Sequence, residues 1–320
     1  MERLTVKNLK LYYETTKGTV RGLDDVSFEL KAGETLGVVG ESGCGKTTLG
    51  TALMKMPTPP GRITGGQIFL DGREILMLSE GDFRREIRWE RIAMVFQGAM
   101  NCLTPVYSIR KLMLETILYH RQMDEAEALE RIRKYLNLVG LPDDVLRRYP
   151  HELSGGMKQR VVIAMALFLE PEIVICDEPT TALDVVVQAQ IINLLKELKR
   201  ELKLSFIFIT HDLAMEAEVA DRIMVMYAGK IAEIGTNEQI YGAGGPAHPY
   251  TRMLLAATPR LHQKVDRLAF IPGAPPDLLD PPQGCRFHPR CPRATAKCRT
   301  EEPQMVEIDE GHQVACWEVH

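Results

Sequence analysis

The chain has 320 residues, of which 45% are hydrophobic and 26% charged, so it can bury a large core and is neither a disordered chain nor a miniature disulfide-bonded protein. Lys and Arg total 39 against 43 Asp and Glu, and the formal net charge is -4. The sequence has no block of five or six like charges, so we expect no nucleic-acid partner.

Residues 1–40 predict short strands separated by turns, and the first fourteen residues alternate polar and apolar side chains. This segment lacks the apolar central stretch of a secretory signal. The longest apolar run, VVIAMALFL at 161–169, is about half of the ~20 residues that a membrane-spanning helix needs. We therefore expect a cytosolic chain that reaches a membrane through a partner.

The predicted strand TLGVVG runs directly into GESGCGKTT at 40–48, ahead of a predicted helix at 46–56. This segment fits the phosphate-binding pattern G-x-x-x-x-G-K-[ST] in the strand-to-helix context that the pattern requires. Inward-turned N–H groups and the positive end of the helix would hold phosphate oxygens. The alternative is a glycine-rich turn that binds nothing. The residues predicted to bind nucleotide here are Gly40, Ser42, Gly43, Cys44, Gly45, Lys46, Thr47 and Thr48.

Two of these side chains have separate predicted roles. Lys46 would reach the β and γ phosphates of a nucleotide, and the Thr47 hydroxyl would coordinate Mg²⁺.

Residues 61–78 return to strand-like sequence with an Asp-Gly turn at 71 and 72, which indicates a mixed sheet. Residues 97–160 predict a helical subdomain inserted into the core. Within it, EAEALERIRKYLNLVGL has apolar residues near helical period with charges between them. The apolar positions are Ala126, Leu129, Ile132, Leu136 and Val139.

Residues 153–235 alternate predicted helices and short buried strands, which predicts an α/β protein with a parallel-sheet core. The strand IVICD ends in Asp177, which is followed by Glu178. Next to a phosphate loop, Asp177 can organise the magnesium shell while Glu178 faces the γ-phosphate and orients a water. Without that loop, a surface turn would be the better interpretation.

The segment LSGGMKQR at 153–160, upstream of ICDEPTTALD, resembles the signature motif of ATP-binding cassette (ABC) proteins. The resemblance runs in order through residues 1–240 and implies a P-loop NTPase of ABC type. That fold has a mixed sheet core, an antiparallel β subdomain and the inserted helical subdomain.

The resemblance also implies a dimer that encloses two ATP molecules. In such a dimer Ser154, Gly155 and Gly156 of one subunit cap the γ-phosphate held by the other subunit's phosphate loop. A Ser-Gly-Gly sequence that opens a helix has N–H donors and a hydroxyl for an anion, which agrees with this role.

Further residues match positions of the family. Gln97 resembles the glutamine that contacts Mg²⁺ and couples to the membrane partner, and His211 resembles the histidine that contacts the γ-phosphate. Asp184 resembles the aspartate at the dimer seam. Tyr13, with Tyr12 beside it, resembles the aromatic residue that stacks on adenine. Outside this context Gln97 and His211 would be polar strand ends, and Tyr13 could equally be a core residue.

After residue 240 the sequence predicts a helix in PYTRMLLAAT and an irregular proline-rich linker, together at 241–284. A cysteine-rich tail follows at 285–320. AHPYTRMLLAATPRL, the linker and GCRFHPRCPRATAKC together resemble the C-terminal extension of the oligopeptide/dipeptide importer ATPases, a family that also serves nickel and, in some organisms, oligosaccharides.

Cys285, Cys291, Cys298 and Cys316 are spaced C-x5-C-x6-C-x17-C. Four thiolates can close a tetrahedral Zn²⁺ site or hold a 4Fe-4S cluster. The tight pair of cysteines typical of structural zinc is absent, and the family resemblance favours the 4Fe-4S cluster. The remaining alternative is that these are merely buried cysteines.

The resemblance implies an ATPase that hydrolyses ATP to power peptide import at the cytoplasmic side of the cell membrane. The implied partners are a second, homologous ATPase subunit in a heterodimer, two membrane permeases and an extracytoplasmic solute-binding protein. Oligosaccharide or nickel is the alternative cargo. A non-transport ABC ATPase that acts on nucleic acid is the less favoured alternative, because the chain has one cassette and a slight negative charge.

Overall fold

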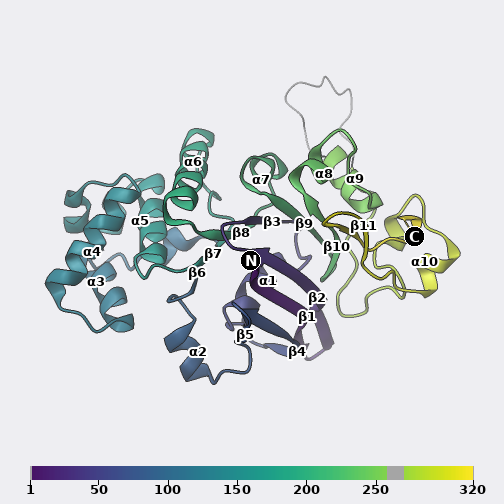
Figure 1. The fold of residues 1–320 in the computed structure, drawn as a ribbon, viewed down its shortest axis with the longest axis horizontal. Coiled ribbons are helices and arrows are strands. Elements are labelled where there is room, and N and C mark those ends of the chain that lie inside the picture. The colour runs from purple at the N-terminus through teal and green to yellow at the C-terminus, as the bar shows by residue number, and fades with distance from the viewer. Residues whose placement is uncertain (1, 258–269, 320) are drawn as a thin grey trace. The chain divides into compact units, whose positions relative to one another are not determined.

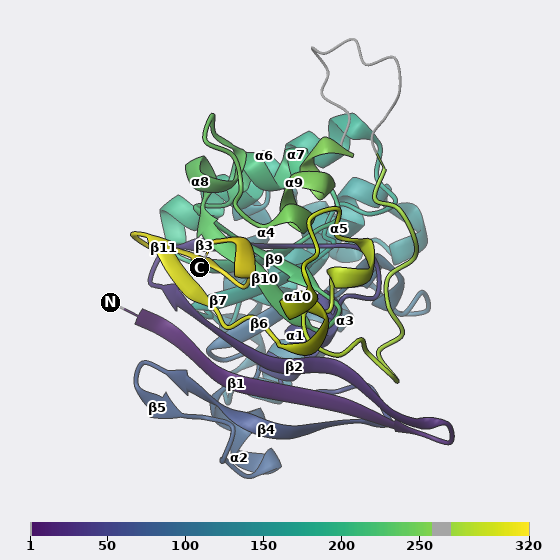
Figure 2. The same ribbon diagram turned by 90° about the vertical axis from the view of Figure 1, so that its right-hand side faces the viewer.

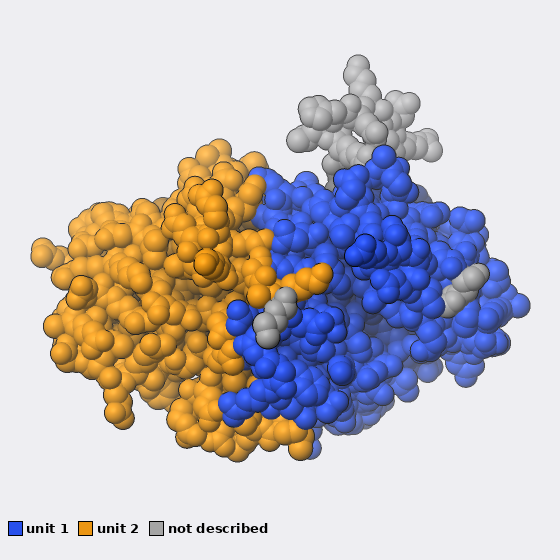
Figure 3. Space-filling model, in the orientation of Figure 1, with its two compact units in different colours: residues 1–30, 34–74, 209–320 blue, residues 31–33, 75–208 orange. Residues whose placement is uncertain are grey.

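A computed structural model describes residues 2–257 and 270–319. The described chain forms two compact units, which Figure 3 shows in blue and orange. Unit 1 comprises residues 1–30, 34–74 and 209–320, and unit 2 comprises residues 31–33 and 75–208. The predicted tail therefore falls in the same unit as the N-terminal strands. Residues 258–269 of the predicted linker lie outside the described residues.

Unit 1 contains an antiparallel sheet of order β2-β1-β4-β5, whose strands lie side by side in Figure 2. Its strands are β1 (Glu2–Thr15), β2 (Gly18–Lys31), β4 (Gly61–Leu70) and β5 (Arg73–Glu74). The first two have 14 residues each and are longer than the short strands predicted. Asp71 and Gly72 have φ of 47° and 78°, the left-handed conformation that a tight hairpin turn requires, which confirms the predicted turn.

Five strands of unit 1 belong to a second sheet, in the order β11-β12-β10-β9-β3. They are β3 (Thr35–Val39), β9 (Arg222–Tyr227), β10 (Lys230–Thr236), β11 (Val306–Asp309) and β12 (His312–Val314). β3 and β9 are parallel, whereas β9, β10, β12 and β11 pair antiparallel. The two strands of the tail thus extend the sheet at β10, an arrangement that the tail sequence did not predict.

The helices of unit 1 flank these strands. They are α1 (Lys46–Leu53), α7 (Leu213–Val219), α8 (Asn237–Tyr241), α9 (Pro249–Ala256) and α10 (Ala296–Thr300). α1 ends before the predicted residue 56 because Lys55 adopts φ of 51°. A hydrophobic cluster joins β9, α9 and the tail through Tyr227, Tyr250 and Phe287. The extension is therefore packed on the sheet through a core of its own.

Unit 2 contains the strand order β8-β7-β6 and most of the helices in teal in Figure 1. Its elements are α2 (Glu80–Glu86), β6 (Ile92–Val95), α3 (Ile109–His120), α4 (Glu125–Leu138), α5 (Gly155–Leu167), β7 (Ile173–Asp177), α6 (Val185–Leu202) and β8 (Ser205–Ile209), the last residue of which counts with unit 1. β6 and β7 are parallel and entirely buried. The predicted parallel core with a mixed sheet is confirmed.

Helices α3, α4 and α5 of unit 2 pack together, α4 contacting both α3 and α5, and they lie side by side in Figure 1. α4 begins at Asp124, whose side chain accepts a hydrogen bond from the N–H of Glu127 at 2.8 Å. Ala128, Ile132 and Leu136 face the core, whereas Ala126 is exposed. The prediction that Ala126 belongs to the apolar face of the helix was therefore wrong. The buried face follows the spacing from Ala128, one half-turn further along the helix. Over residues 2–257 and 270–319, no helix has the length and apolarity needed to cross a bilayer.

Candidate functional site

The phosphate-binding pattern at 40–48 forms the loop between β3 and α1 together with the first turn of α1. Gly40, Gly43 and Gly45 adopt φ of 148°, 79° and 107°. A Cβ on Gly40 would lie 2.2 Å from the carbonyl oxygen of Met226, and one on Gly45 would lie 2.6 Å from that of Gly22. Glycine is therefore required at these two positions by both conformation and close approach.

Lys46 opens α1 and is 7% exposed. Its Nζ donates hydrogen bonds to the carbonyl oxygens of Gly40 at 2.6 Å and Glu41 at 3.1 Å, and it lies 3.8 Å from the Sγ of Cys44. Ser42 and Gly43 are exposed on the loop, and Thr47 is exposed in the first turn of α1. An anion that approaches this exposed side meets the N-terminus of α1, where N–H groups have no partner within the helix.

Tyr13 lies beside this helix, and its OH is 3.1 Å from the Oγ1 of Thr48. Its ring lies against the backbone of Gly22 and Gly61, where an added Cβ would come within 2.7 and 2.8 Å of the ring. The OH of Tyr12 does not contact this helix and instead donates a hydrogen bond to Asp24 at 2.7 Å. Burial, followed by this bond, raises the pKa of Tyr12 to about 12. Of the two tyrosines, Tyr13 is the one next to the phosphate loop.

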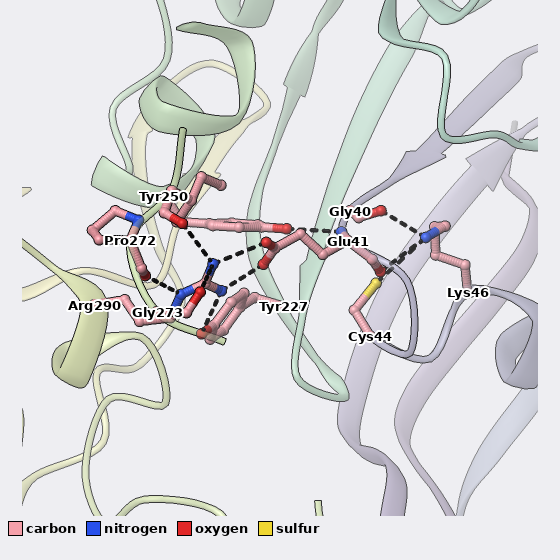
Figure 4. A network of polar contacts seen from close by, with 10 residues as sticks. Gly40, Glu41, Cys44, Lys46, Tyr227, Tyr250, Pro272, Gly273 and Arg290 are labelled. Atoms are coloured by element: carbon pink, nitrogen blue, oxygen red, sulfur yellow. Dashed lines mark hydrogen bonds and ion pairs between the residues drawn. The ribbon is translucent and has the colours of Figure 1, made fainter. Parts of the chain in front are cut away.

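Glu41, the second residue of the loop, is held by residues of the C-terminal extension (Figure 4). Arg290 donates from Nη1 to Oε2 of Glu41 at 2.6 Å and from Nη2 to Oε1 at 2.9 Å. The backbone N–H of Glu41 donates to the OH of Tyr250 at 2.9 Å. These contacts join positions 209 and 249 residues apart in the sequence.

In unit 2, β7 carries Asp177 and Glu178 at its carboxyl end. Asp177 is 1% exposed, and Glu178 adopts φ of 48°. The Oε2 of Glu178 accepts hydrogen bonds from the Nε2 of Gln97 and the Oγ1 of Thr181, both at 2.9 Å. The structure thus brings Gln97, which follows β6, to the predicted catalytic carboxylate. A carboxylate fixed in this way can accept a proton from a water.

Ser154 caps α5, and its side chain accepts a hydrogen bond from the N–H of Met157 at 3.3 Å. Ser154 and Gly155 are exposed, and Gly156 is half-buried. A Cβ on Gly156 would lie 2.8 Å from Val187, so glycine lets the start of α5 approach α6. Asp184 caps α6 through the N–H of Val187 at 3.0 Å. The start of α5 is thus an exposed helix N-terminus with its cap in place.

His211 is exposed between β8 and α7, next to Asp212, which caps α7 through the N–H groups of Ala214 and Met215. The phosphate loop and His211 belong to unit 1, whereas Gln97, Asp177 and the signature motif belong to unit 2. The roles of these residues stay predictions.

The sequence did not point to Glu216, a buried carboxyl on α7 with an exposed fraction of 0%. A Cβ on Gly37 of β3 would lie 1.7 Å from its Oε1, so the carboxyl rests directly on the strand backbone. Neither oxygen has a hydrogen-bond partner among the described residues. Burial raises its pKa well above the usual range, against the opposing effect of Lys46. The burial of Glu216 therefore favours its protonated form.

The four cysteines of the tail line one small pocket, together with His248 and Phe287. Cys298 and Cys316 are buried, and the N–H of Cys285 donates to the carbonyl oxygen of Cys298 at 2.9 Å. Burial raises the pKa of Cys285 to about 11 and also raises the pKa of Cys291 and Cys316. In the parts of the chain that the structure describes, no group of three or more His, Cys, Asp or Glu is arranged to hold a metal ion. The predicted metal site is thus not supported as a compact ligand set.

Comparison with known proteins identifies the family of this chain. The ABC transporter model matches residues 23–181, and the model for the C-terminal region of oligopeptide/dipeptide transporters matches residues 232–298. The chain is 45% identical over 317 residues to the dipeptide transport ATP-binding protein DppD of Bacillus subtilis (strain 168), covering 98% of this chain and 94% of that protein. The chain belongs to the ABC transporter ATPases.

Other relatives of this ABC ATPase agree. The oligopeptide transport ATP-binding protein OppD of Escherichia coli (strain K12) is 45% identical over 316 residues, covering 98% of this chain and 92% of that protein. A dimeric ATP-binding cassette solved in a post-hydrolysis state with ADP and Pi has a TM-score of 0.65 and 27% identity, covering 73% of this chain and 98% of that chain. The predicted ABC fold and family are confirmed.

The contacts of Glu41 with Tyr250 and Arg290 were missed from the sequence. Glu41 occupies a variable position of the phosphate-binding pattern, where no residue type is prescribed. Arg290 is one of many arginines in the chain. The one sequence feature that could have drawn attention to Arg290 is its place among the cysteines of the tail. It lies on the 3₁₀ turn His288–Arg290, which directly precedes Cys291.

Proposed function

We propose that this ABC ATPase powers the import of oligopeptides or dipeptides through partner permeases. One observation carries the proposal: the ABC motifs and the C-terminal region of oligopeptide/dipeptide transporters occur in one chain that is 45% identical, over 98% of its length, to named dipeptide and oligopeptide transport ATP-binding proteins. The second region matches a family model described as the C-terminal region of oligopeptide/dipeptide transporters, which favours a peptide cargo.

In the proposed ATP site, the loop at 40–48 binds the phosphates and Tyr13 stacks on adenine. Glu178 acts as the general base, supported by its hydrogen bond from Gln97. His211 contacts the γ-phosphate. Ser154 and the exposed start of α5 cap the γ-phosphate bound by a second ATPase subunit.

Magnesium fits the donors proposed for it. Thr47, Gln97 and Asp177 each offer side-chain oxygen, the ligand type that Mg²⁺ prefers. The bound ion would neutralise charge on the β and γ phosphates.

We further propose that the subunit pairs with a homologous ATPase in a heterodimer on the cytoplasmic side of the membrane. Two permease subunits and an extracytoplasmic solute-binding protein complete the transporter. ATP binding closes the pair, and hydrolysis with product release reopens it, while Gln97 and its loop pass the motion to a permease. The cargo is chosen by the binding protein and the permeases.

For the tail we propose a 4Fe-4S cluster held by Cys285, Cys291, Cys298 and Cys316. The supporting observation is that all four cysteines line one pocket. The bound cluster would link the four cysteines and so hold the tail segments together.

The experiment that tests the transport proposal is reconstitution of this chain with its permeases, its ATPase partner and its binding protein in liposomes. We expect ATP hydrolysis and uptake of a labelled dipeptide or oligopeptide, both lost with the Glu178→Gln variant. Uptake of nickel or an oligosaccharide in place of peptide would overturn the proposed cargo but leave the proposed ATPase role intact. ATP hydrolysis stimulated by DNA and not by the binding protein would overturn the transport proposal.

The cluster is tested by iron, zinc and acid-labile sulfide analysis of protein purified without oxygen. Iron and sulfide near four per chain are expected. One zinc without sulfide would make the tail a zinc site, and the absence of both metals would leave four free thiols.

A further inference from the structure

We propose that Arg290 and Tyr250 of the C-terminal extension are positioning residues for the phosphate loop, which they hold through Glu41. The inference rests on the proposed nucleotide role of the loop at 40–48. It makes the extension part of the machinery for ATP binding, in addition to any cluster that the extension carries.

The grip on the Glu41 side chain is bidentate and buried. The two Nη atoms of Arg290 contact the two carboxylate oxygens of Glu41 at 2.6 and 2.9 Å, and the Arg290 side chain is 5% exposed. A forked pair of this kind fixes direction as well as distance, which a lysine at the same place would not do.

Arg290 also makes contacts away from Glu41, and these contacts hold its guanidinium in place. Its Nε donates to the carbonyl oxygen of Pro272 at 2.8 Å, and its Nη1 donates to the OH of Tyr227 at 3.3 Å. Its guanidinium lies 5.8 Å from the centroid of the Tyr227 ring. Figure 4 shows these partners around one guanidinium. Contacts with β9 and the linker therefore fix the position of Arg290, and this position does not depend on the phosphate loop.

Tyr250 fixes the backbone of the same residue. Its ring packs against Tyr227 at 4.6 Å and Phe287 at 5.3 Å between centroids, and its OH accepts the N–H of Glu41 at 2.9 Å. The first peptide N–H after Gly40 is therefore turned toward the extension. Side chain and backbone of Glu41 are both anchored from outside the loop.

Two consequences reach the phosphate side of the loop. The carbonyl of Glu41 accepts a hydrogen bond from Lys46 and another from the N–H of Cys44 at 3.2 Å, so the position of Glu41 sets where Lys46 rests and how the loop turns. The carboxylate of Glu41 would also repel a polyphosphate a few residues away. Pairing with Arg290 compensates that charge.

The test is the affinity of the full-length chain for ATP, measured with Mg²⁺ under non-hydrolysing conditions. We expect Arg290→Met to raise the Kd for ATP by about 3- to 30-fold, the usual range for a residue that acts through a contact network. Arg290→Lys keeps the charge without the fork and is expected to lie between Arg290→Met and wild type. In the assembled transporter, KM for ATP should rise while kcat changes far less.

Arg286→Met is the matched control. Arg286 is another buried arginine of the same extension, and it contacts Asp24 and the carbonyl oxygen of Ala228 in place of the loop. Its variant should lose thermal stability but keep an ATP affinity near that of wild type. If Arg286→Met and Arg290→Met weaken ATP binding equally, general loosening of the extension is the cause and the proposal is overturned.

The double variant Glu41→Gln/Arg290→Met separates charge from packing. Glu41→Gln removes the carboxylate that Arg290 compensates, so the double variant should bind ATP more tightly than Arg290→Met alone. Additive losses, or an Arg290→Met affinity equal to that of wild type, would overturn the positioning role while leaving the proposed function intact. A wild-type chain that binds no ATP would overturn both.

Discussion

The phosphate loop at 40–48 and the signature motif at 153–160 are both glycine-containing helix starts, but they are held in different ways. The phosphate loop is anchored from behind by Tyr250 and Arg290, residues more than two hundred positions away. The start of α5 is held by its own cap, Ser154, and its residues Ser154 and Gly155 are exposed. The first arrangement is long-range and the second is local.

The difference matches what each motif is proposed to do. A loop that binds ATP within its own chain gains from being fixed in advance, because a fixed site does not lose entropy when the ligand binds. A helix start that meets the nucleotide of another subunit must stay accessible. The comparison predicts that changes in the extension affect the phosphate loop and leave the signature motif unaltered.

The largest expected effect separates chemistry from this positioning. Glu178→Gln should bind ATP with near-normal affinity but lose about 10²- to 10⁴-fold in turnover, the usual contribution of a general base. The measurement is single-turnover ATP hydrolysis in the assembled transporter. Near-normal turnover in this variant would remove Glu178 from the mechanism.

Glu216 tests how tightly the strand before the phosphate loop is packed. Because its pKa is raised in the folded chain, the unfolded chain releases the proton first, and stability falls as pH rises above the usual carboxyl range. Glu216→Gln keeps the shape without the ionisation. It should stabilise the chain by about 1–3 kcal/mol at pH 8 and by much less at pH 5, measured by denaturant unfolding at both values. An equal effect at both pH values would show that the carboxyl does not titrate as described.

Cys298→Ser sharpens the role of the extension. Loss of one buried thiol from the cysteine pocket should increase proteolytic cleavage of residues 270–300 by about tenfold, equivalent to roughly 1.4 kcal/mol of local stability, and should weaken ATP binding without abolishing it. Cys102→Ser is the control, because Cys102 is exposed in unit 2. Equal cleavage of the two variants would argue against a stapled extension.

The smallest effect concerns the local cap of the signature motif. Ser154→Ala should cost about 1 kcal/mol of stability and leave ATP affinity of the isolated chain unchanged. Ser108→Ala, which removes the cap of α3 in the same unit, should cost a similar amount. In the assembled transporter, only Ser154→Ala should lower ATP hydrolysis. Loss of activity in both variants would show that Ser154 acts only as a structural helix cap.

The parts of the site that the sequence predicted are those set by neighbours along the chain. Gly40 and Gly45 mark the phosphate loop because their backbone conformations and contacts admit no side chain, and this constraint is visible as a pattern. Asp177 is the last residue of a strand of five buried residues, and Ser154 is an ordinary helix cap. Each of these signals lies within a few residues.

The parts that were missed depend on pairings between distant segments. Nothing in the tail sequence says that β12 adds to β10, or which of many carboxylates Arg290 will meet. The buried Glu216 was missed because its neighbour Gly37 lies on another element. The exposed Ala126 shows the same limit on a smaller scale, since the buried face begins two positions further along, at Ala128.

The most direct test of the comparison is amide hydrogen exchange in the full-length chain, wild type against Arg290→Met. The amide of Glu41, bonded to Tyr250, and that of Cys44, bonded to the Glu41 carbonyl, report on the phosphate loop, while that of Met157, bonded to Ser154, reports on the signature motif. We predict faster exchange at Glu41 and Cys44 and no change at Met157. Unchanged exchange in the loop, or an equal increase at all three amides, would contradict an extension that holds the phosphate loop.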